Sequence, residues 1–183
     1  MVIDEHEAIA RLARGEVVAI PTDTVYGVAV ALHVPGATAA LFALKERPSD
    51  VALPVLIPEP GDAGAYTDYV VDLTDYWPGA LTIVGTRTAL SADWDLGGDA
   101  TTVGLRCPDD VQIRRIATQV GPLVTTSANK HGQPPCTTAD QVAAALGDGV
   151  PVLDGGIRNG QPSTVVDATQ DPVVVLRQGG LLL

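Results

Sequence analysis

Two kinds of segment alternate along the chain: longer stretches with apolar residues at helical spacing, and short apolar runs. Two of the helical stretches begin with a capping pattern, in which Asp4 precedes Glu7 and Thr138 precedes Gln141 by three residues. Prolines bound a third helical stretch on both sides, because proline enters a helix easily and does not continue one. The pattern predicts helices over residues 4–15, 35–47, 109–120 and 137–146.

The short apolar runs are typical of buried strands. They are 16–20, 28–32, 53–57, 81–86, 101–106, 122–126, 150–153, 163–167 and 173–177. The run at 28–32 also fits a turn followed by the start of a helix. The later runs follow one another without helices between them, which favours a mixed sheet over a purely parallel one. We therefore expect an α/β (α+β) protein whose residues 1–183 form a single domain.

Composition narrows the class of protein. Apolar residues make up 46% of the chain, but no apolar run reaches the roughly 18 residues that a membrane span needs. No secretion signal follows Met1, so we expect a soluble, cytoplasmic protein. Cys107 and Cys136 match no metal-ligand spacing and are expected to be free thiols. The formal net charge of -11 argues against a broad basic face for nucleic acid.

Polar clusters lie at the ends of the predicted strands. In PTDTVYG (21–27) three hydroxyl residues and Asp23 follow a strand directly, a density that indicates a small polar ligand. Similar clusters are LKERPSD (44–50), TTVGLR (101–106), TTSANKHGQPP (125–135), RNGQPSTVVD (158–167) and LRQG (176–179). Ligands of open α/β sheets usually bind across strand ends, so we expect these clusters to form one pocket.

Few positive charges are available to such a pocket. The ammonium group of Lys45 and the planar guanidinium group of Arg47 together suit a polyphosphate. Basic residues also stabilise the C-terminal end of a helix, which is the alternative role of this pair. Arg106 and Arg177 end apolar runs, where they could equally be solvated strand ends or partners of one of the many carboxylates. Asp23 could act as a base or cap its loop. The chain has neither a Walker loop nor a dinucleotide fingerprint.

Taken together, the motifs resemble the YrdC/TsaC family of threonylcarbamoyl-AMP synthases in its short single-domain form. The matching segments, in order from about residue 15 to 180, are IPTDTVYGVAV, LKERP, WPGALT, TTVGLRCP, LVTTSAN with GQPPCTT, PSTVVD and LRQG. The resemblance implies the YrdC-like (YrdC/RibB) fold, a twisted mixed β-sheet flanked by helices around an open cavity.

The resemblance also implies a reaction. ATP, L-threonine and bicarbonate would give threonylcarbamoyl-AMP and pyrophosphate, with Mg²⁺ entering alongside ATP. The product would pass to a tRNA threonylcarbamoyl-transferase complex that modifies adenosine next to the anticodon. The enzyme would need no membrane, and its own binding to tRNA would be weak or absent.

Site residues follow by likeness to the family. Lys45 and Arg47 would be the catalytic residues that hold ATP phosphates. The residues expected to bind ATP are Lys45, Arg47, Thr102, Ser127, Pro135 and Arg177. Those expected to bind threonine are Thr24, Arg106, Thr125 and Ser163, with Thr22 and Tyr26 shaping the threonine pocket. No protein ligands to a metal are expected.

The chain departs from the family pattern at two positions. His131 stands where many members have the second serine of SANxSG, and Leu56 where some members carry a histidine. Two other functions remain open on the sequence: a non-catalytic RNA-binding or translation-associated paralogue, and carbamoyl-adenylate chemistry on a different acceptor. The charge of -11 counts against the first, since backbone binding needs clustered cations.

Overall fold

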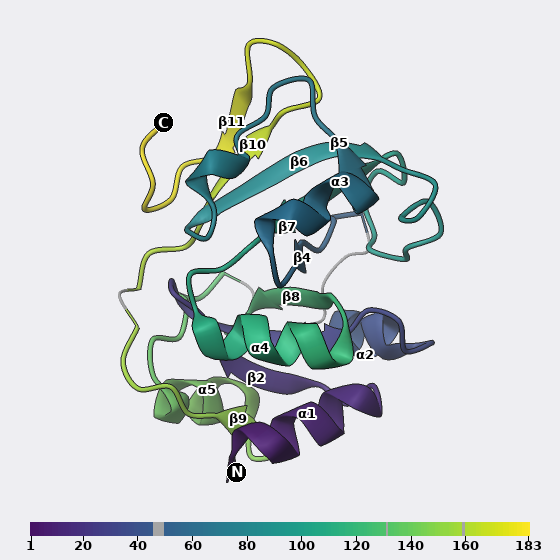
Figure 1. The fold of residues 1–183 in the computed structure, drawn as a ribbon. Helices are drawn as coiled ribbons and strands as arrows, with labels where there is room; N and C mark the ends of the chain where they lie inside the picture. Colours follow the sequence, from purple (N-terminus) through teal and green to yellow (C-terminus); the bar gives the residue numbers. More distant parts are fainter. Residues whose placement is uncertain (46–49, 131, 159) are drawn as a thin grey trace.

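A computed structural model describes residues 1–45, 50–130, 132–158 and 160–183 (Figure 1). In these ranges the strands are β1 Val2–Ile3, β2 Val18–Pro21, β3 Tyr26–Ala31, β4 Val55–Leu56, β5 Thr67–Asp68, β6 Leu81–Arg87, β7 Thr102–Arg106, β8 Leu123–Ser127, β9 Val152–Leu153, β10 Thr164–Asp167 and β11 Val174–Arg177. The helices are α1 Glu5–Ala13, α2 Ala37–Lys45, α3 Ala63–Tyr66, α4 Val111–Val120 and α5 Ala139–Leu146, with 3-10 turns η1 Pro60–Asp62 and η2 Thr74–Tyr76.

These strands form one mixed sheet, as the sequence predicts. Its order is β1-β9-β2-β3-β8-β4-β7-β6-β10-β11, with β5 paired to β6. β3 lies antiparallel between β2 and β8, whereas β4 runs parallel to β7 and β6 parallel to β10. Consecutive β9 and β10 are far apart in this order, so the segment between them must cross the molecule.

Helices α1 and α4 cover one face of the sheet. The Asp4 carboxylate accepts the amide of Glu7 at 2.8 Å to cap α1, and Gly15 ends the turn after it with φ +78°. Leu12 and Ile116 then pack with Ile20 of β2 in a buried cluster. In Figure 1 the two helices lie next to each other beside β2.

Helices α2 and α5 join the core on the opposite face. Leu41 and Val142 pack in a second cluster with Val28 and Val124. Strand β3 alternates between the two clusters and is buried along its whole length. This double cover explains the continuous apolar run at 28–32, which forms a strand and not a helix start.

The remaining differences from the sequence pattern are local. The run at 53–57 gives only the two-residue β4, and β1, β5 and α3 have no clear signal in the pattern. Thr138 caps α5 as predicted, but the side chain of Gln141 accepts from the amide of Thr137 and not from that of Thr138. Among the described residues, no helix combines the length and the apolar character that a membrane crossing requires.

Candidate functional site

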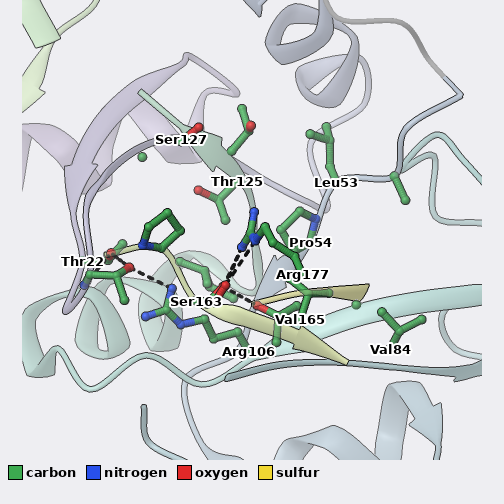
Figure 2. A pocket seen from close by; sticks show the side chains of 18 of the residues that line it. Thr22, Leu53, Pro54, Val84, Arg106, Thr125, Ser127, Ser163, Val165 and Arg177 are labelled. Atoms are coloured by element: carbon green, nitrogen blue, oxygen red, sulfur yellow. Dashed lines mark hydrogen bonds between the residues drawn. The ribbon is translucent and has the colours of Figure 1, made fainter. Parts of the chain in front are cut away.

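A cavity of about 260 Å³ opens on one face of the sheet (Figure 2). Residues two apart line it from several strands, because alternate side chains of a strand point to the same face. They are Pro54 and Leu56, Thr82 and Val84, Thr102, Gly104 and Arg106, Thr125 and Ser127, and Ser163 and Val165. Parts of five predicted polar clusters meet here, but no described residue of LKERPSD lines the cavity, which extends over the face of the sheet and not only past strand ends.

The loop after β2 forms one wall of the cavity. The hydroxyl of Thr22 accepts the amides of Thr24 and Val25 at 3.2 and 3.3 Å and donates to the carbonyl of Val25 at 2.7 Å. Thr22 therefore closes the loop on itself, as threonine hydroxyls commonly do in turns. The hydroxyl of Thr24 lies 2.9 Å from that of Thr22 and lines the cavity.

Arg106, the last residue of β7, joins this loop to the other half of the sheet. Its guanidinium donates to the carboxylate of Asp23 at 2.6 Å, to the hydroxyl of Thr24 at 3.1 Å and to the carbonyl of Gly79 at 3.0 Å. The side chains of Arg106 and Asp23 are only 7% and 13% exposed. Asp23 is thus an ion-pair partner, a role that the sequence did not suggest. Both terminal guanidinium nitrogens carry a second N–H, and the side chain lines the cavity.

Ser163 lies at the centre of a second polar group. Its hydroxyl is 2.9 Å from that of Thr82, and Arg177 donates to its hydroxyl at 3.1 Å and to its carbonyl at 2.8 Å. Figure 2 shows the guanidinium groups of Arg106 and Arg177 on either side of Ser163. Two planar cations with a hydroxyl between them suit an anionic ligand that also carries hydroxyl groups.

Gly179 holds the segment after β11 against this group. A methyl group on Gly179 would overlap the carbonyl of Pro162 and the backbone of Ser163. We expect Gly179→Ala to destabilise the protein by about 1 to 3 kcal/mol through overpacking and to raise KM for the ligand that Ser163 contacts. Denaturant unfolding and steady-state kinetics measure the two effects.

The matched control is Gly64→Ala. Gly64 lies in α3, and an added methyl group there meets no atom within 4 Å. This variant should be as stable as the parent or slightly more so, since alanine favours a helix. Equal stability of the Gly179 and Gly64 variants would contradict the close packing at Gly179.

Lys45 reaches the same region from the end of α2. Its ammonium donates to the carbonyl of Ser127 at 2.8 Å and to that of Asn129, where β8 leaves the sheet. The hydroxyl of Thr125 donates to the carbonyl of Val28 at 3.1 Å. Lys45 therefore lies next to Ser127, and their shared part in ATP binding stays a prediction. Arg47 and His131 lie outside the described residues.

Two predicted site residues lie away from the cavity. Tyr26 points its hydroxyl to the segment after β9, where it accepts from the amide of Gly155 at 3.0 Å and lies 2.9 Å from the carbonyl of Gly156. Burial, supported by Asp154, raises the pKa of this hydroxyl, so it stays a donor at neutral pH. Tyr26 is absent from the described lining of the cavity, and its part in shaping the threonine pocket stays a prediction. Pro135 lines a separate groove beside α5.

Part of the cavity wall has no clear signal in the sequence. Thr82 lies within the WPGALT motif, yet its place in the cavity depends on the pairing of β6 with β10. The apolar part of the wall includes Leu53, Val84, Leu96, Val103 and Val165. In the sequence these residues look like ordinary core positions, and only the register of the strands shows that they face an open space.

Cys107 and Cys136 are buried and free, as predicted. Burial raises the pKa of the Cys107 thiol to about 11, so it is protonated at pH 8. We expect iodoacetamide to modify neither cysteine in the folded protein at pH 8 and both in denaturant, because the thiolate is the reactive form. Mass spectrometry counts the adducts. Rapid modification of the folded protein would contradict this placement.

Candidate metal ligands are scarce in the described part of the chain. No group of three or more His, Cys, Asp and Glu side chains there could hold a metal ion. The described residues that line the cavity include no carboxylate.

Comparisons with known proteins agree with this geometry. The Sua5/YciO/YrdC family model, described as "Telomere recombination", matches residues 10–179. A putative threonylcarbamoyl-AMP synthase of Mycobacterium tuberculosis is 37% identical over 94% of this chain and 82% of its own length. The threonylcarbamoyl-AMP synthase of Chromohalobacter salexigens is 34% identical over 88% of this chain and 90% of its own.

A solved structure is also similar. P. abyssi Sua5 complexed with L-threonine superposes with a TM-score of 0.87 at 27% identity over 99% of this chain. This chain spans 58% of the length of that protein. The similarity supports a YrdC-type fold around the cavity described above.

Proposed function

The chain belongs to the Sua5/YciO/YrdC family, and from this premise we propose that it is a threonylcarbamoyl-AMP synthase, which joins L-threonine, bicarbonate and ATP. The observation that carries the proposal is the cavity itself. It gathers the hydroxyls of Thr24, Thr125 and Ser163 between two guanidinium groups, from segments more than 130 residues apart in the sequence. Relatives that share most of the chain are named for this activity.

The threonine half of the site lies around Arg106. The remaining N–H groups of its guanidinium bind the threonine carboxylate, with its orientation fixed by Asp23 and Thr24. Thr125 and Ser163 lie on the same cavity wall and bind the polar groups of the amino acid. The threonine complex of P. abyssi Sua5, which has the same fold, supports a threonine site in this cavity.

The ATP half of the site lies toward β8 and β11. Lys45 next to Ser127, Thr102 on β7 and Arg177 on β11 bind the nucleotide, and Arg47 joins Lys45 at the phosphates. Pro135, in its groove beside α5, borders this region from outside the cavity. Mg²⁺ enters with ATP and is held mainly by phosphate oxygens, which fits a cavity whose described lining has no carboxylate.

The reaction then needs no protein nucleophile. The threonine amine and bicarbonate form a carbamate with loss of water, and a carbamate oxygen attacks the α-phosphorus of ATP. The bond from that phosphorus to the bridging oxygen breaks, and pyrophosphate leaves. The protein holds the reactants in place, and the cations of Lys45, Arg47 and Arg177 stabilise charge on the leaving group.

The wider role follows from the product. Threonylcarbamoyl-AMP is a reactive mixed anhydride that must be passed on, and we propose a tRNA threonylcarbamoyl-transferase complex as its acceptor. With a net charge of -11 the chain itself binds tRNA weakly or not at all. We propose that the protein works in the cytoplasm and that residues 1–183 fold as one domain.

One incubation tests the proposal. The protein is mixed with ATP, Mg²⁺, bicarbonate and labelled threonine, and threonylcarbamoyl-AMP and pyrophosphate are measured by chromatography. We expect both products in equal amounts, and neither when threonine or bicarbonate is left out. A folded sample that binds ATP and forms neither product would refute the synthase and favour the non-catalytic paralogue.

A further inference from the structure

The connection from β9 to β10 is described at residues 154–158 and 160–163, which we call the strap. It leaves β9 near one end of the sheet order and enters β10 near the other. Figure 1 shows it as the yellow-green trace that runs along the left side from β9 to β10. Its last two residues, Pro162 and Ser163, line the cavity. Ser163 therefore joins the strap to β10 at the cavity wall.

Hydrogen bonds attach the strap to the loop that carries Thr24, to Thr137 and to Tyr26. The amide of Gly160 donates to the carbonyl of Thr24 at 3.2 Å, and the amide of Arg158 donates to the carbonyl of Thr137 at 2.9 Å. The Tyr26 hydroxyl accepts from the amide of Gly155 at 3.0 Å. A shift of the strap would thus displace Thr24 and Ser163 together.

The side chain of Arg158 adds a charged anchor outside the cavity. It lies 3.3 Å from the carboxylate of Asp110 and donates to the carbonyl of Gly155 at 2.8 Å. The two charged side chains are 18% and 9% exposed. Asp110 is itself fixed, because its other carboxylate oxygen accepts the amide of Ile113 at 3.1 Å and caps α4. The pair therefore joins the strap to the rigid start of a helix.

Burial sets this ion pair apart from the pairs at the surface. Its arginine Nε is buried and has no acceptor among the described residues, so the arrangement is not optimised for stability alone. On the same helix, Arg115 is 55% exposed and pairs with Glu5, a contact that should contribute little. Because Arg158 is buried, incompletely paired and part of a strap that ends in the cavity, it indicates a role in holding the strap in place.

We propose that Arg158, through its ion pair with Asp110, is a positioning residue that fixes the strap and thereby the threonine side of the site. This inference rests on the proposed synthase activity. Arg158 is not among the described residues that line the cavity, and it acts on Thr24 through the strap, whose Gly160 amide donates to the Thr24 carbonyl. Loss of the pair should therefore affect threonine and leave ATP almost unaffected.

The first test is steady-state kinetics of Arg158→Met and Asp110→Asn. Methionine keeps the length of the arginine stem, and asparagine still caps a helix as well as aspartate does. We expect KM for threonine to rise about 10-fold in each variant and KM for ATP to change by less than about 2-fold. The double variant should be no worse than either single one, because both lose the same contact.

Two variants serve as controls. Arg115→Met removes a surface ion pair from the same helix and should leave both KM values unchanged. Arg158→Lys keeps a charge for Asp110 but loses the planar fork, and should recover part of the threonine affinity. Unchanged KM for threonine in both test variants, or equal rises for threonine and ATP, would overturn the proposal.

Hydrogen exchange tests the strap without any activity. In Arg158→Met the amides of Gly155 and Gly160 should exchange faster than in the parent, while the amides of α4 keep their protection. This readout separates the two hypotheses. If the parent protein makes no product, the proposed synthase activity is refuted. Hydrogen exchange of the two glycine amides still decides whether Arg158 holds the strap. Unchanged protection of both glycine amides would refute the positioning role even in an active enzyme.

Discussion

Replacement of Arg106 by methionine is expected to lower kcat/KM for threonine by about 100- to 1,000-fold, because the variant loses the cation that binds the threonine carboxylate. The same change should destabilise the fold by about 3 kcal/mol or more, since it leaves the buried carboxylate of Asp23 without its ion-pair partner. Pyrophosphate release at varied threonine measures the first effect, and denaturant unfolding measures the second.

Two further variants separate binding from folding. Arg106→Lys keeps the charge opposite Asp23 but loses the planar fork that also reaches Thr24 and Gly79, so it should fold and still lose about 10-fold or more in kcat/KM for threonine. Arg114→Met removes an arginine of α4 that pairs with Glu59 and is absent from the described lining of the cavity, and it should keep full activity. Normal threonine kinetics in both Arg106 variants would remove Arg106 from the threonine site.

The sequence predicted most helices and long strands because their signals are local. Asp4 caps α1 and Thr138 caps α5 through bonds that span three residues. Two-residue strands are different, since β1 exists only because Val2 and Ile3 pair with β9, some 150 residues away. No pattern over a short window contains that information.

The same distinction applies to the site. Motifs predicted which segments meet in the cavity, and Thr24, Arg106, Thr125 and Ser163 all line it. The motif could not show that Tyr26, two residues after Thr24, points to the strap and not into the cavity. Side-chain direction depends on the register of β3, which its pairing with β2 and with the distant β8 decides. Partners such as Asp23 for Arg106 likewise come from distant segments.

Selectivity among amino acids should be strong at this site. Thr24, Thr125 and Ser163 are 2%, 8% and 6% exposed, so their hydroxyls have little access to solvent. We expect valine to have a kcat/KM at least about 100-fold below that of threonine, since it has threonine's shape but leaves polar groups of the site unpaired. Serine keeps the hydroxyl and lacks one methyl group, so it should fall only about 10-fold below threonine.

The competing explanation is that these hydroxyls serve the fold alone. The hydroxyl of Thr22 donates to the carbonyl of Val25, and the hydroxyl of Thr125 donates to the carbonyl of Val28. Some of the hydroxyls therefore do stabilise the backbone. Ser163 decides between the two, because its partners are the side chains of Thr82 and Arg177 at the cavity wall. Ser163→Ala should therefore reduce the preference for threonine over valine by about 10-fold if the site reads the substrate hydroxyl. Pyrophosphate release with threonine, serine and valine at equal concentrations measures the preference in both proteins. If the parent protein turns over valine as fast as threonine, the hydroxyls serve the fold and the threonine pocket must lie elsewhere.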